Sequence, residues 1–318
     1  MPLTFRDRLA IRLSKAYLNV GEVFLYLFFA RAHKGITKRR GLWYAEGKRT
    51  ALDVFSPENA EGKLPLFIYI HGGGFVSGIR TNRRFYCYNW VEKGYVAANI
   101  GYDHALDAAH PEHIRQIFKG IGFVLDRAEE YGIDASRVVV AGDSAGGYFA
   151  ALVGAVASHP ALYDELGIDF KYRDSFKVSA CVLLSGLFDP VRSIGTRFPS
   201  IALYVRALLG VSSEELVQYG SRKGGLPCAA DAYADHDFPP SFIVASKADR
   251  LKKESEALAE ELKNACVKYG YFTCTGVNGV HAGALACELA RSGRECLKEA
   301  QAFVAEVFAE KKKKEESD

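Results

Sequence analysis

One pentapeptide constrains the fold of this chain more than any other feature. Gly142-Asp143-Ser144-Ala145-Gly146 fits the pattern G-x-S-x-G and lies between two runs of opposite character. The apolar, β-branched residues 138–141 before it predict a strand, and residues 147–152 after it predict a helix. A serine in a sharp strand-to-helix turn has its hydroxyl exposed at the C-terminal edge of a sheet. We therefore interpret Ser144 as a candidate nucleophile.

The rest of the chain alternates short apolar runs with helical stretches. Continuous apolar strands separated by helices predict an α/β fold with a mostly parallel sheet covered on both faces. An antiparallel edge hairpin is expected at residues 42–45 and 50–55. The other expected strands are residues 66–70, 95–100, 138–141, 180–184, 242–245 and 271–275, and the expected helices are residues 114–131, 254–269 and 284–309.

These elements predict one catalytic domain, at residues 41–310. We expect a small helical cap, made by residues 1–40 and by an insertion near residues 190–235. The charged residues 311–318 are expected to form a disordered tail.

The first forty residues are basic and contain an apolar stripe. They hold nine Lys or Arg against Asp7 and Glu22. We expect an amphipathic helix that buries the stripe over the mouth of the catalytic site, with a membrane-surface helix and a cleaved signal as alternatives. The apolar run at residues 23–30 is too short to span a bilayer. The stripe consists of Leu9, Leu13, Tyr17, Val20, Phe24 and Leu27.

Composition excludes several classes of protein. With 49% hydrophobic and 25% charged residues, the chain has the profile of a soluble globular protein. A net charge of +3 is too small to indicate a nucleic-acid partner. The seven cysteines form no C-x-x-C pair, which argues against zinc ribbons and favours a reduced, cytoplasmic protein. A membrane partner is not expected, and a homodimer is left open.

A second glycine-rich motif, His71-Gly72-Gly73-Gly74, follows the expected strand at residues 66–70. Glycines there allow backbone N–H groups to approach a substrate oxygen without interference from a Cβ atom. We expect Gly73, Gly74 and Ala145 to donate the N–H groups of an oxyanion hole, with His71 bracing the loop. A phosphate-binding loop is not supported, because G-x-x-x-x-G-K-[ST] is absent from the sequence.

The two motifs together resemble the hormone-sensitive-lipase-like family of α/β-hydrolase carboxylesterases. HGGG is followed by GDSAGG about seventy residues later, and the resemblance covers roughly residues 40–310. It implies an α/β-hydrolase fold and a serine esterase that needs no cofactor and acts on short- to medium-chain esters. One departure lies between the motifs, where the family's Tyr-Arg-Leu-Ala-Pro-Glu-like stretch is replaced by GYDHALD at residues 101–107.

In the α/β-hydrolase fold the acid and the base follow the nucleophile in the order Ser, Asp or Glu, His. His281 follows the last expected strand, so we expect it to be the base. His159 at the end of the nucleophile helix and His236 before a strand are its rivals. Asp249, just past the strand at residues 242–245 and in the family's Asp-x-Leu setting, is the expected acid, and Asp189 is its rival.

A cluster of acidic residues and histidines between the two motifs is a weaker candidate site. Zinc ligation is the alternative here, but Pro111 breaks the spacing, so we expect no metal and interpret the segment as a solvated loop before a helix. The chemistry expected of the whole chain is ester hydrolysis. An amidase, formamidase or peptidase, and a non-catalytic ligand receptor, remain as alternatives. The cluster consists of Asp103, His104, Asp107, His110, Glu112 and His113.

Overall fold

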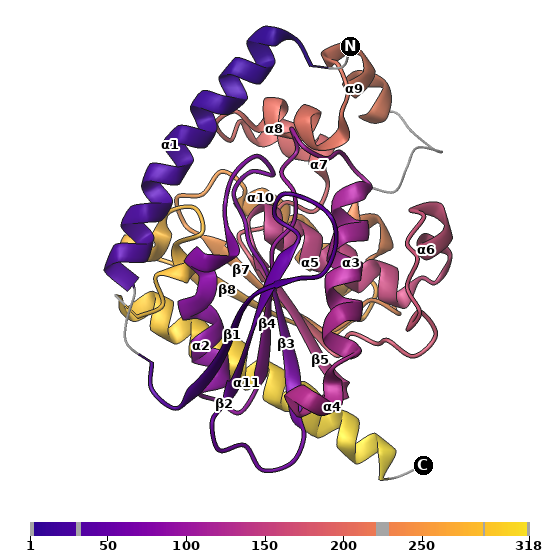
Figure 1. Ribbon diagram of the computed structural model, residues 1–318. Helices are drawn as coiled ribbons and strands as arrows, with labels where there is room; N and C mark the ends of the chain where they lie inside the picture. The colour runs from indigo at the N-terminus through magenta and orange to yellow at the C-terminus, as the bar shows by residue number, and fades with distance from the viewer. Residues whose placement is uncertain (1–2, 30–32, 221–228, 289, 317–318) are drawn as a thin grey trace.

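The computed structural model of the chain describes residues 3–29, 33–220, 229–288 and 290–316. Its centre is a sheet, seen with the helices around it in Figure 1. The sheet has eight strands in the order β1-β2-β4-β3-β5-β6-β7-β8. β2 pairs antiparallel with both β1 and β4, and the remaining neighbours are parallel. The mostly parallel sheet is therefore confirmed. The strands are β1 (Ile36–Trp43), β2 (Ala51–Pro57), β3 (Leu64–Ile70), β4 (Val96–Ile100), β5 (Ile133–Asp143), β6 (Ala180–Leu184), β7 (Ser241–Ser246) and β8 (Tyr269–Cys274).

Helices cover both faces of the sheet because the central strands are apolar on both sides. In β3, Leu66 and Ile68 contact one buried cluster, which includes residues of α3, α5 and α10, whereas Phe67 and Tyr69 contact a second, which includes residues of α2 and α11. The helices are α1 (Phe5–Phe29), α2 (Arg84–Val91), α3 (Glu112–Leu125), α4 (Ala128–Tyr131), α5 (Ala145–Ser158), α6 (Ala161–Glu165), α7 (Pro190–Ser193), α8 (Ile201–Leu209), α9 (Ser213–Gly220), α10 (Lys252–Asn264) and α11 (Arg291–Glu315).

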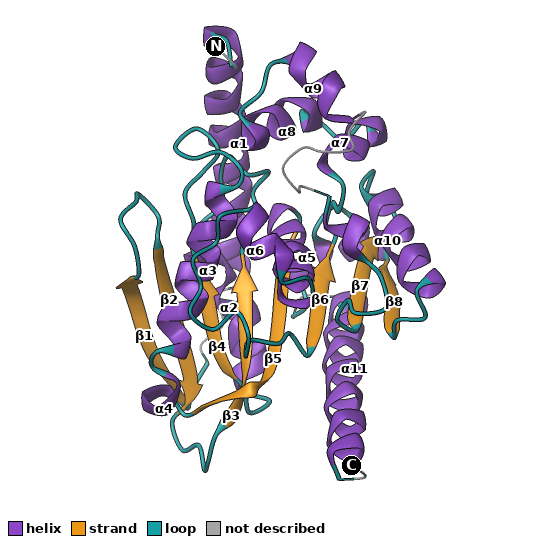
Figure 2. Ribbon diagram, turned by 90° about the vertical axis from the view of Figure 1, so that its right-hand side faces the viewer, coloured by secondary structure: helices purple, strands orange, loops and turns teal. Residues whose placement is uncertain are grey.

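The C-terminal ends of the parallel strands point toward a layer of short helices. α7, α8 and α9 lie beyond this edge of the sheet (Figure 2). They come from the connection between β6 and β7, within the segment that the sequence predicts as a cap insertion near residues 190–235. Residues 221–228 of that segment are outside the described part of the chain.

Several predicted boundaries are wrong. β1 begins at Ile36, so the edge hairpin takes residues that we assigned to the cap. α3 ends at Leu125 and a separate short helix follows it, while β8 starts at Tyr269, where a helix was expected to end. α11 continues to Glu315, so the charged residues expected to be disordered from residue 311 are helical up to that point. Lys followed four residues later by Glu, as in Lys312 and Glu316, supports such an exposed helix end.

The predicted burial of the N-terminal stripe is also wrong where the structure describes it. α1 lies along the outside of the molecule, beside α8 (Figure 1). Leu9 and Leu13 are exposed, whereas Ile11, on the opposite face, is fully buried. The side chains of Tyr17, Val20, Phe24 and Leu27 are outside the described part of the chain. No described helix has the length and apolar content needed to cross a membrane.

The crossing of α5 over β3 requires glycine and gives a first prediction. A Cβ on Gly146 would lie 2.1 Å from the backbone oxygen of Ile70, so Gly146→Ala forces backbone atoms apart. We expect a loss of about 3 kcal/mol in the free energy of unfolding. Gly122→Ala in α3 is the matched control, because its Cβ would make only an ordinary contact, 3.7 Å from Phe170. Denaturant unfolding measures both, and equal stability of the two variants would contradict the prediction.

Candidate active site

Ser144 lies in a strained turn between β5 and α5. Its backbone angles are φ 51° and ψ −117°, which non-glycine residues rarely adopt. The N–H of Ser144 donates to the Leu184 carbonyl at 2.8 Å, which attaches the turn to β6. The glycines on either side make the turn possible, because a Cβ on Gly142 would lie 2.2 Å from the Gly146 oxygen. The sequence pattern around Ser144 therefore corresponds to a strand-turn-helix in three dimensions.

The structure brings Ser144, His281 and Asp249 together in one hydrogen-bonded chain. His281 Nε2 lies 2.8 Å from Ser144 Oγ, and His281 Nδ1 lies 2.7 Å from Asp249 Oδ2. An ionised carboxylate only accepts, so Nδ1 donates to Asp249 and Nε2 is left to accept the serine proton. The Asp249 side chain is 1% exposed and the His281 side chain 25% exposed. The imidazole is thus held by a buried acid while its outer edge remains open.

Asp249 is fixed by its own backbone as well as by the histidine. Its second oxygen, Oδ1, accepts the N–H of Leu251 at 2.9 Å at the start of α10. The rival acid, Asp189, instead caps α7 by accepting the N–H groups of Val191 and Arg192. Asp189 is therefore occupied by a structural role at the entrance to the β6–β7 connection.

The two rival histidines lie elsewhere. His159 bonds to Asp235 through Nε2 at 2.8 Å, and His236 has a largely exposed side chain. In the described part of the chain, neither histidine forms a hydrogen bond with Ser144. The structure thus offers one histidine, His281, as partner to the serine hydroxyl.

The glycine loop after β3 has the geometry that close approach requires. Gly73 and Gly74 have φ of 127° and 58°, and a Cβ on Gly73 would lie 2.2 Å from the Ser77 carbonyl oxygen. That carbonyl belongs to a tight turn in which Gly73 O accepts the N–H of Ser77 at 2.9 Å. Ala145 is the first residue of α5, so its N–H has no partner within the helix. These features are consistent with an oxyanion hole.

A buried carboxylate that the sequence analysis did not single out joins the two motifs. Asp143 Oδ1 accepts the Gly72 N–H at 3.0 Å, the Tyr69 hydroxyl at 2.8 Å and Arg83 Nε at 3.0 Å. Burial alone would raise the pKa of Asp143, but the Arg83 charge and these hydrogen bonds hold the pKa below its ordinary value. In the sequence, Asp143 occupies the first variable position of G-x-S-x-G, so the motif itself does not mark it.

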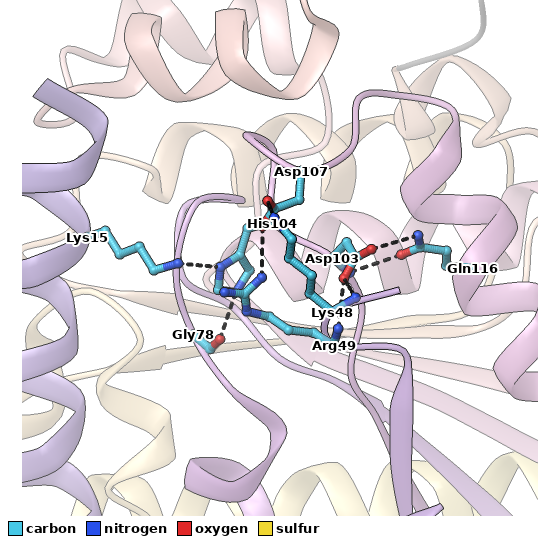
Figure 3. Close-up of polar contacts among 8 residues, drawn as sticks. All are labelled: Lys15, Lys48, Arg49, Gly78, Asp103, His104, Asp107 and Gln116. Atoms are coloured by element: carbon cyan, nitrogen blue, oxygen red, sulfur yellow. Dashed lines mark hydrogen bonds and ion pairs between the residues drawn. The ribbon is translucent and has the colours of Figure 1, made fainter. Parts of the chain in front are cut away.

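A histidine pair and a tyrosine brace the glycine loop from behind. The ring of His71 stacks on Tyr102 with centroids 4.5 Å apart, and the Tyr102 hydroxyl donates to the His71 carbonyl at 2.8 Å. His104 Nε2 donates to the Gly78 carbonyl at 2.9 Å, and Lys15 Nζ from α1 donates to His104 Nδ1 at 3.0 Å (Figure 3). Burial, reinforced by nearby positive charges, lowers the pKa of His104 to about 2, so this histidine stays neutral. The expected bracing therefore includes residues of the divergent segment 101–107.

The interpretation of the segment around Asp103 as a solvated loop is wrong. Asp103, His104, His110 and His113 are buried. Asp103 accepts the backbone N–H groups of Lys48 and Arg49 and pairs with Gln116, and Asp107 forms ion pairs with Lys48 and Arg49 (Figure 3). The side chains of Asp103 and Asp107 thus hold the β1–β2 loop in place. Among the described residues, the only group with metal-binding spacing is the exposed Asp235-His236-Asp237.

Two aromatic residues of the β6–β7 connection reach the site, and sequence reasoning missed both. The Phe198 ring lies edge-on to His281, with centroids 4.6 Å apart. The Tyr204 ring of α8 lies where it would be 3.1 Å from a Cβ on Gly74. No motif marks these residues, since Tyr204 is one aromatic residue in an apolar stretch and Phe198 is one between Arg197 and Pro199.

Comparisons with known proteins identify the family of this chain. Residues 52–262, more than half of the chain, match the BD-FAE family. The chain belongs to the BD-FAE family. Among curated relatives, Lipase 2 of Moraxella sp. (strain TA144) is 27% identical over 242 residues, which cover 70% of this chain and 56% of that protein. Mouse hormone-sensitive lipase is 30% identical over 152 residues, 46% of this chain and 20% of that protein. The resemblance to the hormone-sensitive-lipase-like family is confirmed.

Solved structures confirm the α/β-hydrolase fold of this BD-FAE family member. Esterase B from Lactobacillus rhamnosis (HN001) superposes with a TM-score of 0.84 at 20% identity, covering 98% of both chains. A hyperthermophilic esterase from the archaeon Pyrobaculum calidifontis gives a TM-score of 0.66 at 20% identity, covering 96% of this chain and 99% of that one. The curated relatives are longer, since the Moraxella protein is matched over little more than half of its length.

The buried pair of Asp143 and Arg83 gives a second prediction. Asp143→Asn removes the negative charge that faces the buried Arg83 guanidinium, which should cost about 3–5 kcal/mol of unfolding free energy. Asp134→Asn, at the other end of β5, is the matched control, because its pair with Arg137 is partly exposed and worth about 0–1 kcal/mol.

The pH dependence of that difference follows from the lowered pKa of Asp143. A carboxyl whose pKa is lower in the folded protein stabilises it fully above the unfolded value, about 3.9, and loses this contribution as the pH falls through the folded value. The stability gap between the parent protein and Asp143→Asn should therefore narrow only below about pH 4. Denaturant titrations across pH test this, and a gap that narrows at neutral pH would contradict it.

Proposed function

We propose that this protein is a serine carboxylesterase. The observation that carries the proposal is the hydrogen-bonded chain from Ser144 Oγ through His281 to the buried Asp249, at 2.8 Å and 2.7 Å. It lies at the C-terminal edge of a sheet in an α/β-hydrolase fold, where such chemistry is performed. The names of its relatives, lipases and esterases, support the same reaction class.

Each group has a definite role in the proposed reaction. Ser144 Oγ attacks the carbonyl carbon of the ester as His281 Nε2 accepts its proton. The N–H groups of Gly73, Gly74 and Ala145 stabilise the oxyanion that forms. His281 then protonates the leaving alcohol, and water hydrolyses the acyl-enzyme with His281 as base. Asp249 keeps Nδ1 protonated and stabilises the imidazolium, so the reaction needs no cofactor.

The cap supplies the shape of the proposed acyl site. Phe198 beside His281 and Tyr204 beside Gly74 place aromatic rings close to both the base and the glycine loop. Apolar walls so near the reacting centre favour an ester with an apolar acyl group and limit its length. We infer that short- to medium-chain esters are the substrates, and that the residues 190–235 form the cap. The buried free cysteines fit action in a reducing cytoplasm.

The nucleophile and base give the third prediction. Because the residues of a triad act as a unit, Ser144→Ala and His281→Ala should each lower kcat for p-nitrophenyl esters by about 10⁴-fold or more and lose about the same amount. The assay uses esters of increasing acyl length beside matched anilides. Thermal unfolding shows whether each variant is folded. Most of the activity remaining in either folded variant would refute the proposal, and faster anilide than ester hydrolysis would indicate an amidase.

The acid gives the fourth prediction. Asp249→Asn should lower kcat by about 10⁴-fold with the fold intact, because the amide can no longer hold the required tautomer of His281. Asp189→Asn is the matched control, since the Asp189 side chain caps α7, whereas the described hydrogen bond of His281 Nδ1 is to Asp249. A larger loss of kcat in Asp189→Asn than in Asp249→Asn would show that the acid is misassigned.

A further inference from the structure

The outward face of α1 carries exposed apolar side chains in its first three turns. Phe5, Leu9 and Leu13 are spaced by four residues, so they form one stripe along the helix. Their exposed fractions are 79%, 47% and 65%, so all three belong to the exposed large apolar side chains of the described residues. Three adjacent exposed apolar residues of this size mark an interaction surface more than an ordinary protein surface.

Positive charges flank this stripe. Arg6, Arg8 and Arg12 are exposed on α1, and Arg6 lies on one side of the stripe while Arg8 and Arg12 lie on the other. None of the three forms an ion pair with a described residue. The one acidic residue in this part of the helix, Asp7, faces inward and binds Arg206 of α8 at 2.8 Å. The outward face thus combines apolar side chains with unneutralised guanidinium groups.

The inward face of α1 fixes this orientation. Ile11 is fully buried in the main core cluster, Asp7 makes its paired contact with Arg206, and Lys15 donates to His104. A rotation that buried Leu9 and Leu13 would expose Ile11 and break both polar contacts. The stripe is therefore presented outward by the folded protein. Figure 1 shows α1 along the outside of the molecule, and Figure 3 shows Lys15 directed toward His104.

Charge decides which partner fits. A second copy of this chain, paired through the same face, would bring arginines against arginines with no acid on the described outward face to neutralise them. An anionic lipid surface provides what both parts of the face need, since its phosphates attract guanidinium groups and its acyl region accepts apolar side chains.

The geometry points to α1 as an interfacial docking helix: we propose that Phe5, Leu9 and Leu13 insert into an anionic membrane surface while Arg6, Arg8 and Arg12 contact its lipid phosphates. The helix lies in the plane of the interface and does not cross it. This docking does not rest on the proposed esterase activity, because it uses none of the residues assigned to that reaction. It replaces the expectation that membrane contact is absent, which assumed that Leu9 and Leu13 are buried.

Co-sedimentation of the full chain with vesicles tests the proposal. Vesicles of phosphatidylcholine containing phosphatidylserine should bind the parent protein, and pure phosphatidylcholine vesicles should bind it much less. Raising the salt from about 0.1 M to about 1 M should release it, because screening shortens the range of the arginine charges. The partition coefficient of the triple variant Phe5→Ser, Leu9→Ser, Leu13→Ser onto the anionic vesicles should be lower than that of the parent by about tenfold or more. Trp43→Ser, which replaces an exposed apolar residue on β1, is the control and should leave the partition coefficient unchanged.

A charge variant tests the arginines independently of the apolar residues. Arg6→Gln with Arg12→Gln should weaken binding about tenfold or more, whereas Lys312→Gln with Lys313→Gln, the same charge change on exposed residues of α11, should leave it unchanged. Equal thermal unfolding temperatures exclude loss of fold as the cause. Three results would overturn the proposal: no binding of the parent protein to the anionic vesicles, undiminished binding of the triple variant, or a dimer in analytical ultracentrifugation that the triple variant abolishes.

Discussion

The carboxylate of Asp143 is the interaction on which the candidate site depends. It ends β5 one residue before Ser144, and it accepts the N–H of Gly72 at the start of the glycine loop. It therefore fixes the distance between the proposed nucleophile and the proposed oxyanion donors, which come from two different strands. A charge this deeply buried is stable only with a counter-charge and full hydrogen bonding, and Arg83 and Tyr69 supply both. His281 and Asp249 are then positioned against two segments that Asp143 holds together, the turn at Ser144 and the glycine loop after β3.

Much of the site was predictable because its determinants are local. A glycine-flanked serine between an apolar strand and a helix specifies its own turn, and the closest contact that excludes a Cβ at Gly142, with the Gly146 oxygen, arises within that turn. The position of His281 follows from chain order in a parallel sheet, in which all loops at the C-terminal edge meet. The confirmed sheet and fold, and the juxtaposition of Ser144, His281 and Asp249, come from these two rules.

What was not predictable depends on contacts between distant parts of the chain. Asp103 is a polar residue in a polar segment, so the sequence indicates solvent exposure; it is buried because Gln116 and the backbone of the β1–β2 loop satisfy its oxygens. Phe198 and Tyr204 reach the site because the β6–β7 connection folds back over the edge of the sheet. Neither aromatic residue has a spacing that distinguishes it from core residues.

The orientation of α1 also depends on contacts between distant parts of the chain, which the sequence pattern does not reveal. Apolar residues recur at helical spacing on two faces of this segment, one through Leu9 and Leu13 and another through Ile11 and Leu18. Periodicity therefore predicts a helix without deciding which face is inside. The choice is made by partners far away in sequence: Arg206 lies 199 residues from Asp7, and His104 lies 89 residues from Lys15. Because His104 also holds the Gly78 carbonyl, the inner face of α1 is attached to the loop that carries Gly73 and Gly74. The same helix thus presents apolar and basic side chains outward and supports the proposed oxyanion loop from its inner face.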